Sequence, residues 1–276
     1  MTGLDRIIEN ALAEDIHTGD ITTLAVMRES REARARLTAK EPMVLAGIEA
    51  AARVFHLLDP RIIFTPRFSD GDTLETGAII AEITGDAAAL LQGERVALNI
   101  LQRMCGVATL TARYVAAVKG TKARVVDTRK TTPGLRILDK YAVRVGGGIN
   151  HRTGLYDGVL IKENHITAAG GIGVAVSRAR AWIPHTMKIE VETETLAEVA
   201  EALAAGADII MLDNMDTATM REAVAMIAGR ALVEASGGVN LETIREIAAT
   251  GVDIISVGAL THSARSMDIS MLLEVC

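Results

Sequence analysis

The sequence predicts an α/β protein in which an α+β module is followed by a (β/α) barrel. Hydrophobic residues make up 49% of the 276 residues and aromatic residues only 3%, which is typical of helices packed on a largely parallel sheet. After Ala123, short apolar strands alternate with helical stretches. The later strands end at Glu192, Asp213, Ser236 and Gly258, at intervals of 21 to 23 residues, the length of a βα unit.

The region before the barrel mixes short strands with helices. Three β-prone segments, separated by proline, glycine and aspartate turn signals, lie at 34–47, 61–68 and 78–85. Between the first two, apolar residues at helical spacing predict a helix over 48–58. The stretch 87–119 has the same spacing and no proline, which predicts one or two long helices.

Six apolar segments of the second region are the predicted barrel strands. They lie at 123–129, 158–164, 187–193, 208–214, 231–238 and 253–259. The longer interval between the first two, from Arg129 to Lys162, is basic and rich in glycine, and predicts an extra βα piece or an active-site loop. In such barrels the functional residues lie at the carboxyl ends of the strands, so the polar residues that end each strand are the candidates.

Composition argues against several classes of function. The formal net charge is −6 and no basic tail or stripe is present, so we expect no binding to nucleic acid or to a membrane surface. The chain has no run of about 18 apolar residues, and its acidic, amphipathic start is not expected to be a leader. Two cysteines, Cys105 and Cys276, make neither a disulfide framework nor a metal motif. We therefore expect a cytoplasmic protein.

Acidic side chains on two neighbouring strands predict a metal site. The alternation of a strand places Lys188, Glu190 and Glu192 on one face, and we expect all three to point into the barrel. Charges there are costly unless they are paired or bind a ligand, and for Glu190 a structural Lys–Glu network is the alternative. Glu192 and Asp213 end adjacent strands, and two such carboxylates suit Mg²⁺ held together with waters and phosphate oxygens.

Basic residues and glycines complement these acids. Six candidate cations lie from the end of the first strand to the end of the second: Arg129, Lys130, Arg144, His151, Arg152 and Lys162. After the last two strands, small residues are typical of a phosphate site built from backbone N–H groups: Ser236, Gly237, Gly238, Ser256 and Gly258. The sequence thus predicts a site for a phosphorylated, Mg²⁺-chelating substrate and a second acidic substrate, as in group transfer from a sugar phosphate.

Eight segments, taken in order, resemble the quinolinate phosphoribosyltransferase family. The most specific are DTRKTTPGLR (127–136) and GGGINHRTGLYDGVLIKENHI (146–166). The others are EDIHTGDITT (14–23), ERVALNILQRMCGVAT (94–109), IEVET (189–193), MLDN (211–214), EASGGV (234–239) and SVGALTHSARSMDIS (256–270). The resemblance therefore extends from near the N-terminus to residue 270.

This resemblance implies both a fold and a reaction. The fold is an N-terminal α/β sandwich domain, here residues 1–120, and a C-terminal incomplete (β/α) barrel, residues 121–276, whose last segment can pack back on the N-terminal domain. The enzyme would be a carboxylating nicotinate-nucleotide diphosphorylase, a pentosyltransferase. It would convert quinolinate and phosphoribosyl pyrophosphate into nicotinate mononucleotide, pyrophosphate and CO₂ in NAD biosynthesis.

The resemblance also implies roles for individual residues. Those expected around the two carboxylates of quinolinate are Arg103, Arg129, His151, Arg152 and Lys162. Lys130 and Lys162 are expected near the pyrophosphate, whereas Glu192 and Asp213 hold the ribose hydroxyls and Mg²⁺; these four are the expected catalytic residues. The remaining expected substrate contacts are Thr131 and the residues around the 5-phosphate. The latter are Ser236, Gly237, Gly238, Ser256 and Gly258, of which the last two lie on either side of Val257.

Arg103 precedes the barrel, on the predicted long helix. In the family this arginine comes from the neighbouring subunit, so the resemblance implies a homodimer with shared active sites, or a higher oligomer built from it. Cys105 is expected in the packed core rather than as a nucleophile.

Other functions remain open from the residues. A nicotinate phosphoribosyltransferase, or a molybdenum-operon relative, would share the phosphate site, but the NHR motif (150–152) and Arg103 favour a dicarboxylate acceptor. A Schiff-base aldolase is a second alternative, because Lys162 ends a barrel strand as such lysines do. A non-catalytic nucleotide sensor is a third, and it would be expected to lack some of the charged site residues.

Overall fold

The computed structural model describes residues 3–27, 29 and 31–275, so Cys276 lies outside the described residues. The chain divides into two compact units. The first comprises 1–112, 131–147 and 263–276, and the second comprises 113–130 and 148–262. The prediction placed a boundary at residue 120 and allowed the last segment to pack back on the N-terminal domain, but it did not include 131–147 in that domain.

The first unit contains an antiparallel sheet in the strand order β12-β1-β5-β3. The strands are β1 (Glu32–Ala39), β3 (Ile63–Pro66), β5 (Ile79–Asp86) and β12 (Ile269–Val275), with a small separate pair of β2 (Met43–Val44) and β4 (Thr73–Leu74). Along β1 every second residue is buried, which is the burial pattern of a sheet covered on one face. The end of the chain returns to this sheet, since Ala33 to Ala39 pair with Val275 to Ile269.

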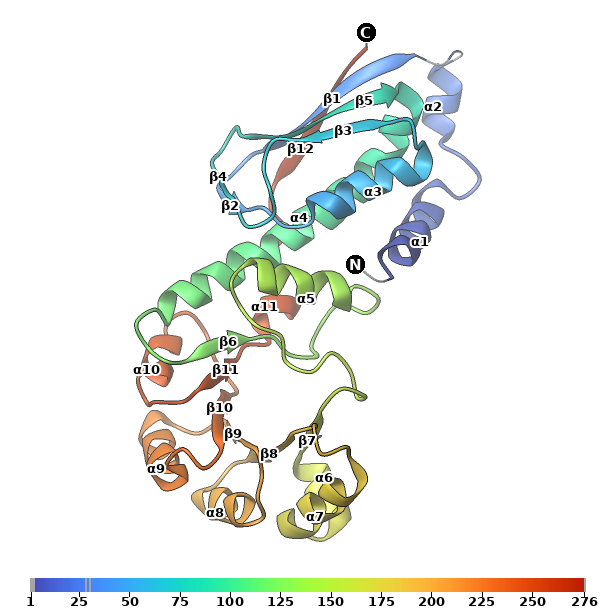
Figure 1. The fold of residues 1–276 in the computed structure, drawn as a ribbon. Coiled ribbons are helices and arrows are strands. Elements are labelled where there is room, and N and C mark those ends of the chain that lie inside the picture. The colour runs from blue at the N-terminus through green and yellow to red at the C-terminus, as the bar shows by residue number, and fades with distance from the viewer. Residues whose placement is uncertain (1–2, 28, 30, 276) are drawn as a thin grey trace. The chain divides into compact units, whose positions relative to one another are not determined.

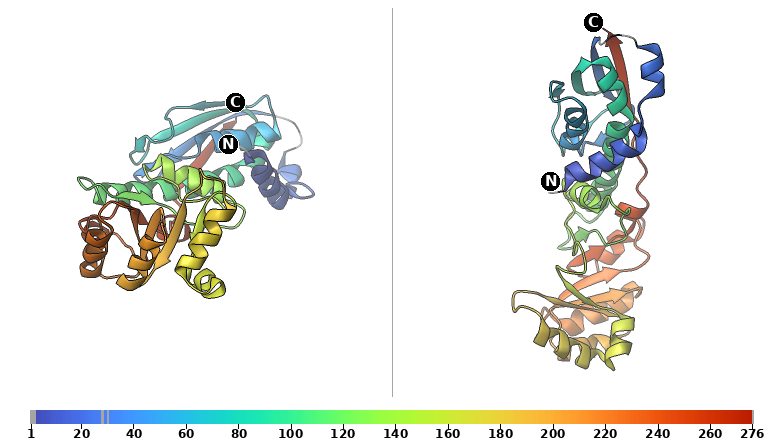
Figure 2. Two further views of the ribbon diagram at one scale, coloured as in Figure 1. Left: turned by 60° about the horizontal axis from the view of Figure 1, so that its bottom comes forward. Right: turned by 90° about the vertical axis from the view of Figure 1, so that its right-hand side faces the viewer.

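Helices cover one face of this sheet, which confirms the predicted α/β sandwich (Figure 2). The helices of this unit are α1 (Leu4–Ile16), α2 (Ile21–Val26), α3 (Ile48–Leu58), α4 (Ala87–Ala117, which continues into the second unit) and α5 (Arg136–Val145). Of these, α3 and α4 lie along the sheet (Figure 1, Figure 2). The predicted helix over 48–58 is confirmed, and the stretch 87–119 forms one long helix. Gly93 allows α4 to pack closely on α3, because a Cβ there would lie 2.8 Å from the Phe55 ring.

The second unit is built on six parallel strands in the order β6-β11-β10-β9-β8-β7. They are β6 (Arg124–Val126), β7 (Val159–Ile161), β8 (Ile189–Thr193), β9 (Ile209–Asp213), β10 (Leu232–Ser236) and β11 (Ile254–Ser256). Each lies within one of the six predicted segments. The strands follow an open arc whose edges are β6 and β7, so the predicted incomplete barrel is confirmed (Figure 1).

The helices of the second unit follow the strands, and most of them lie on the outer side of the arc (Figure 1). They are α6 (Glu163–Ala169), α7 (Ile172–Trp182), α8 (Leu196–Ala204), α9 (Thr217–Ile227), α10 (Ile244–Ala248) and α11 (Ala259–His262). Side-chain caps turn the chain sharply after two strands. Thr195 accepts from the N–H of Glu198 to begin α8, and Asp216 accepts from two N–H groups to begin α9. The connections between these strands and the helices that follow them are therefore short loops, and they lie around a cavity.

The long interval between the first two barrel strands holds α5 and an irregular loop over 146–158 rather than a complete βα unit. Its helix belongs to the first unit, and from Gly148 onward its loop belongs to the second. Among the described helices, none is both long and apolar enough to cross a membrane.

Candidate active site

The carboxyl ends of the barrel strands surround a cavity of about 810 Å³. Twelve of the residues singled out in the sequence line it: Arg129, Lys130, His151, Arg152, Lys162, Glu192, Asp213, Ser236, Gly237, Gly238, Ser256 and Gly258. All of them belong to the second unit. The parallel sheet brings them together because the carboxyl ends of its strands meet at one edge.

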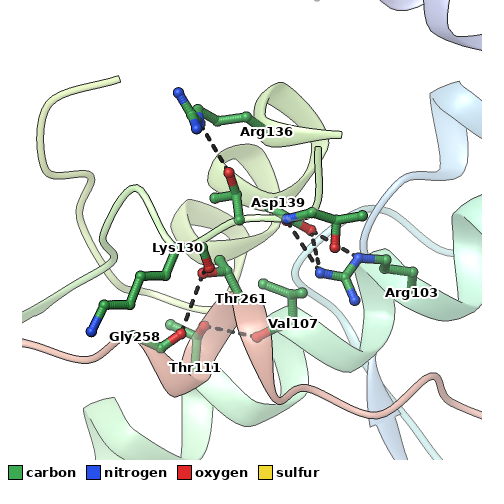
Figure 3. Close-up of polar contacts among 10 residues, drawn as sticks. Arg103, Val107, Thr111, Lys130, Arg136, Asp139, Gly258 and Thr261 are labelled. Atoms are coloured by element: carbon green, nitrogen blue, oxygen red, sulfur yellow. Dashed lines mark hydrogen bonds and ion pairs between the residues drawn. The ribbon is translucent and has the colours of Figure 1, made fainter. Parts of the chain in front are cut away.

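Three predicted residues lie elsewhere. Arg103 and Thr131 belong to the first unit, where Arg103 donates to the buried Asp139 from Nε at 3.0 Å and from Nη2 at 3.2 Å (Figure 3). The Thr131 hydroxyl accepts from Arg136 at 2.9 Å. Arg144, one of the six candidate cations, lies on α5 with its guanidinium 5.8 Å from the Tyr141 ring centre.

The prediction that Lys188 points into the barrel is wrong. Lys188 precedes the first residue of β8 and is exposed, and its charge acts on Asp208, which immediately precedes β9. Alternation gives the side of a strand on which a residue lies, but not how far along the barrel it lies. Glu190 and Glu192, further along β8, do lie on the inner side: Glu190 meets His151, and Glu192 lines the cavity.

Two guanidinium groups form a basic wall of the cavity. Arg152 donates from Nη1 to the carbonyl of Gly158 at 3.1 Å, which holds its side chain across the loop. Burial lowers the pKa of Arg152, and the nearby charge of Arg129 lowers it further. Two like charges held together in this way favour the binding of an anion between them.

The loop that carries His151 and Arg152 is fixed by a buried aspartate that sequence reasoning missed. Asp127 follows β6 directly and is fully buried. It accepts from the Asn150 amide at 2.6 Å and from the His151 backbone N–H at 2.8 Å. A carboxylate directly after a predicted buried strand could have indicated this role for Asp127. The prediction for this segment was instead based on the basic residues that follow Asp127.

His151 reaches two buried carboxylates. Its Nε2 lies 3.0 Å from Glu190 on β8 and 3.7 Å from Glu234 on β10. On its other side, Nδ1 accepts from the backbone N–H of Arg152 at 2.8 Å. Burial, and then the charge of Glu190, raise the pKa of Glu234 to about 8. Glu234 lies within the predicted strand segment 231–238, but nothing in the sequence linked it to His151.

The expected catalytic pair Lys162 and Glu192 form an ion pair, from the ends of β7 and β8. Asp213 ends the next strand, β9, and its carboxylate accepts from the Asn214 amide at 2.7 Å. The hard oxygen donors of Glu192 and Asp213 both line the cavity, and two of them leave most of an octahedral shell to water and phosphate oxygens. This donor set fits Mg²⁺.

Lys130 and Gly258 lie side by side in the cavity lining. The Thr261 hydroxyl donates to the Lys130 carbonyl at 2.8 Å (Figure 3). A Cβ at Gly258 would lie 3.2 Å from Lys130 Cδ and 3.1 Å from the His262 ring. Glycine at this position therefore leaves room for Lys130 beside the β11 end.

Position 237 requires glycine because of both its backbone conformation and its surroundings. Its φ is +91°, and a Cβ there would lie 2.1 Å from the side-chain oxygen of Asn214. Asn214 itself has a φ of 53° and donates its N–H to Ser236 at 3.0 Å. The ends of β9 and β10 are thus locked together at the cavity rim, with backbone exposed as a phosphate site requires.

Replacing Gly237 with alanine is expected to destabilise the protein by about 2–5 kcal/mol, the sum of a left-handed backbone cost and of overpacking against Asn214. Gly229→Ala is the control, because Gly229 has a similar φ of +75° and no atom within 4 Å of a Cβ. Its expected cost is about 1–2 kcal/mol. Urea unfolding of both variants gives the comparison, and equal losses would contradict the proposed close packing at Gly237.

Cys105 is buried, with its sulfur 3.4 Å from the backbone nitrogen of Ala46, and burial raises the pKa of the thiol to about 12. The expectation of a packed, unreactive cysteine is confirmed.

Comparison with known proteins identifies relatives over nearly the whole chain. The family model for the N-terminal domain of quinolinate phosphoribosyl transferase matches residues 20–105, and that for its C-terminal domain matches residues 107–272. A Bacillus subtilis protein named probable nicotinate-nucleotide pyrophosphorylase [carboxylating] is 47% identical over 268 residues, 97% of this chain and 92% of its own length. The Arabidopsis thaliana chloroplastic enzyme of that name is 43% identical, over 98% of this chain and 83% of its own.

Solved structures agree with these relatives. The crystal structure of NadC from Streptococcus pyogenes superposes with a TM-score of 0.96 at 46% identity, covering 100% of this chain and 99% of that chain. The nicotinate-nucleotide pyrophosphorylase of Francisella tularensis has a TM-score of 0.94 at 42% identity, covering 98% and 96%.

Proposed function

The chain belongs to the quinolinate phosphoribosyltransferase family, and we propose that its barrel cavity transfers the phosphoribosyl group of phosphoribosyl pyrophosphate to quinolinate. The products are nicotinate mononucleotide, pyrophosphate and CO₂, in NAD biosynthesis. The observation that carries the proposal is the composition of one cavity, where four cations, three carboxylates and a glycine-rich rim meet. The cations are Arg129, Lys130, Arg152 and Lys162.

The basic wall suits an acceptor with two carboxylates. Quinolinate carries about two negative charges and the donor carries several more, so the two substrates repel each other strongly in a site of low dielectric. Arg129 and Arg152 offer forked N–H donors that match carboxylates. We assign the quinolinate subsite to this wall, and His151, on the same loop as Arg152, belongs to it.

The donor is assigned to the remaining walls of the cavity. Gly237, Gly238 and Gly258 would receive the 5-phosphate on exposed backbone N–H groups. Glu192 and Asp213 would bind the ribose hydroxyls and hold Mg²⁺. When bound there, Mg²⁺ would neutralise part of the charge that develops on the leaving pyrophosphate.

The chain's own residues act mainly by position and charge. Lys130 and Lys162 hold the pyrophosphate oxygens while the bond from ribose C1 to oxygen breaks and its electron pair leaves with pyrophosphate. The pyridine nitrogen, aligned by the arginines, forms the new bond to C1. The 2-carboxylate then departs as CO₂, and its electron pair stays on C2, beside the positive ring nitrogen, until a solvent proton replaces it. No nucleophilic side chain is required.

We also propose a homodimer in the cytoplasm. Arg103 lies outside the barrel cavity and lines a cavity of about 430 Å³ in the first unit. Its guanidinium is held by Asp139, and as in the family it would extend the basic wall of a neighbouring subunit's site. The buried thiol of Cys105 is consistent with a reducing compartment.

The activity is tested by supplying phosphoribosyl pyrophosphate and Mg²⁺ with quinolinate or nicotinate as the acceptor, and measuring mononucleotide formation. Turnover with quinolinate alone is the expected result. Turnover with nicotinate alone would keep the phosphate site but would contradict the assignment of the basic wall.

Removing either arginine is expected to weaken quinolinate binding. A charge-assisted hydrogen bond is worth about 1.5–3 kcal/mol, so Arg129→Ala and Arg152→Ala should each raise the Kd about 10- to 150-fold in calorimetry. Arg180→Ala is the control, since Arg180 pairs with Asp208 at 2.7 Å outside the cavity. Unchanged affinity in both cavity variants would rule out this subsite.

A further inference from the structure

The cluster of His151, Glu190 and Glu234 has a role in the site that the proposed function does not assign. Three donor atoms, one from each residue, lie within 4.8 Å of one another. Glu190 is 4% exposed and Glu234 is 1% exposed. Among the described residues, no hydrogen-bond partner reaches Glu190 Oε1 or Glu234 Oε1. Buried acceptors of this kind need a proton or a cation to satisfy them.

The Nδ1 side of the ring indicates which form of His151 is present. The backbone N–H of Arg152 points at Nδ1 from 2.8 Å, so Nδ1 accepts this hydrogen bond and cannot itself carry a proton. The remaining ring proton must lie on Nε2, which is 3.0 Å from Glu190 Oε2. This geometry corresponds to a neutral imidazole that donates to Glu190.

A metal ion at the cluster is disfavoured by the same contact. A neutral histidine that binds a metal through Nε2 must carry its proton on Nδ1. That proton would face the N–H of Arg152, donor against donor. A proton on Glu234 satisfies the buried oxygens instead, because burial, and then the charge of Glu190, raise the pKa of Glu234 to about 8.

We propose that Glu190 and Glu234 are positioning residues that hold His151 as its neutral Nε2–H tautomer beside the acceptor subsite. The inference rests on the proposed function only for the identity of that acceptor. Asp127 already fixes the backbone of His151. Glu190 and Glu234 therefore fix what remains free, which is the orientation of the imidazole ring. The positive charge of the subsite then comes from Arg129, Arg152 and Lys162, and His151 contributes an aligned, uncharged wall.

The tautomer is measured directly by nuclear magnetic resonance on the full chain with ¹⁵N-labelled histidine at pH 7. The chain has six histidines, and a His151→Gln variant identifies the signals of this one. The expected result is a protonated Nε2 and an unprotonated Nδ1. A proton on Nδ1, or on both nitrogens, overturns the proposal, as does loss of the Nε2 proton on adding Zn²⁺.

Two matched double variants test the positioning role. Glu190→Met with Glu234→Met removes both acceptors, and is expected to mix the His151 tautomers and raise the KM for quinolinate about tenfold with little change in kcat. Glu190→Gln with Glu234→Gln keeps carbonyl acceptors and should restore both readouts. Unchanged signals and KM in the methionine variant would overturn the proposal. If the methionine variant does not fold, the spectra of the wild-type protein and of the glutamine variant still show which tautomer His151 adopts. Because the spectra need no substrate, they stand even if quinolinate is not the acceptor.

Discussion

Lys162→Ala is expected to lower kcat/KM by about 10²- to 10³-fold, the usual cost of removing one preorganised donor from a developing negative charge. Two effects add up at this position. The lysine is lost from the leaving pyrophosphate, and Glu192 loses the cation with which it is paired. Steady-state rates with both substrates measure the change, and Lys162→Arg should recover part of it because the charge returns.

Lys122→Ala is the matched control. Lys122 also pairs with a carboxylate, Asp253 at 2.7 Å, but it lies outside the barrel cavity, and exposed pairs contribute little to stability. The control should keep the wild-type rate. A Lys162→Ala enzyme that also kept it would remove this lysine from the proposed chemistry, and trapping of a substrate on Lys162 by borohydride would favour a Schiff-base reaction instead.

The same variant tests the shared site. If Arg103 completes the cavity of a neighbouring subunit, an inactive Arg103→Ala protein mixed with inactive Lys162→Ala protein should regain about a quarter of the wild-type rate, since half of the sites in mixed dimers are intact. No recovery after subunit exchange would contradict the proposed dimer.

Glu192→Gln and Asp213→Asn are expected to lower Mg²⁺-dependent turnover at least about 100-fold while leaving the fold intact. Each substitution keeps the side-chain shape and removes one negative charge from the two that would hold the ion. Titrating the rate with Mg²⁺ should show a weaker apparent affinity in both variants. Circular dichroism and the urea midpoint check the fold.

Glu222→Gln provides the control for charge alone, because Glu222 is exposed on α9, away from the cavity. It removes the same charge and should keep the wild-type Mg²⁺ response. If Glu192→Gln and Asp213→Asn behaved like this control, the proposed metal site would be wrong.

Periodicity was sufficient to predict the frame of the protein. The apolar runs around β8 to β11 are short and regularly spaced, and the carboxyl ends of parallel strands must share one edge, so Glu192, Asp213 and Ser236 could be placed together from the sequence. The helix over 48–58 was equally clear from its apolar spacing. These are local patterns, and local patterns are what a single sequence carries most strongly.

Contacts between distant segments were not predictable in the same way. Glu190, Glu234 and His151 come from two strands and a loop, and only the curvature of the sheet brings them within reach. Asp127 precedes Asn150, its partner in the loop, by 23 residues. The prediction for Lys188 was wrong because alternation gives the side of the strand on which a residue lies, but not its position along the barrel. The inclusion of 131–147 in the first unit likewise depends on tertiary packing.

The most direct test of the central claim uses quinolinate labelled in its 2-carboxylate. With phosphoribosyl pyrophosphate and Mg²⁺, labelled CO₂ should appear in equal amount with pyrophosphate, and none should appear without the donor. Arg152→Ala should lower both products together. Pyrophosphate release without labelled CO₂, or no reaction with quinolinate at all, would contradict the account of this cavity.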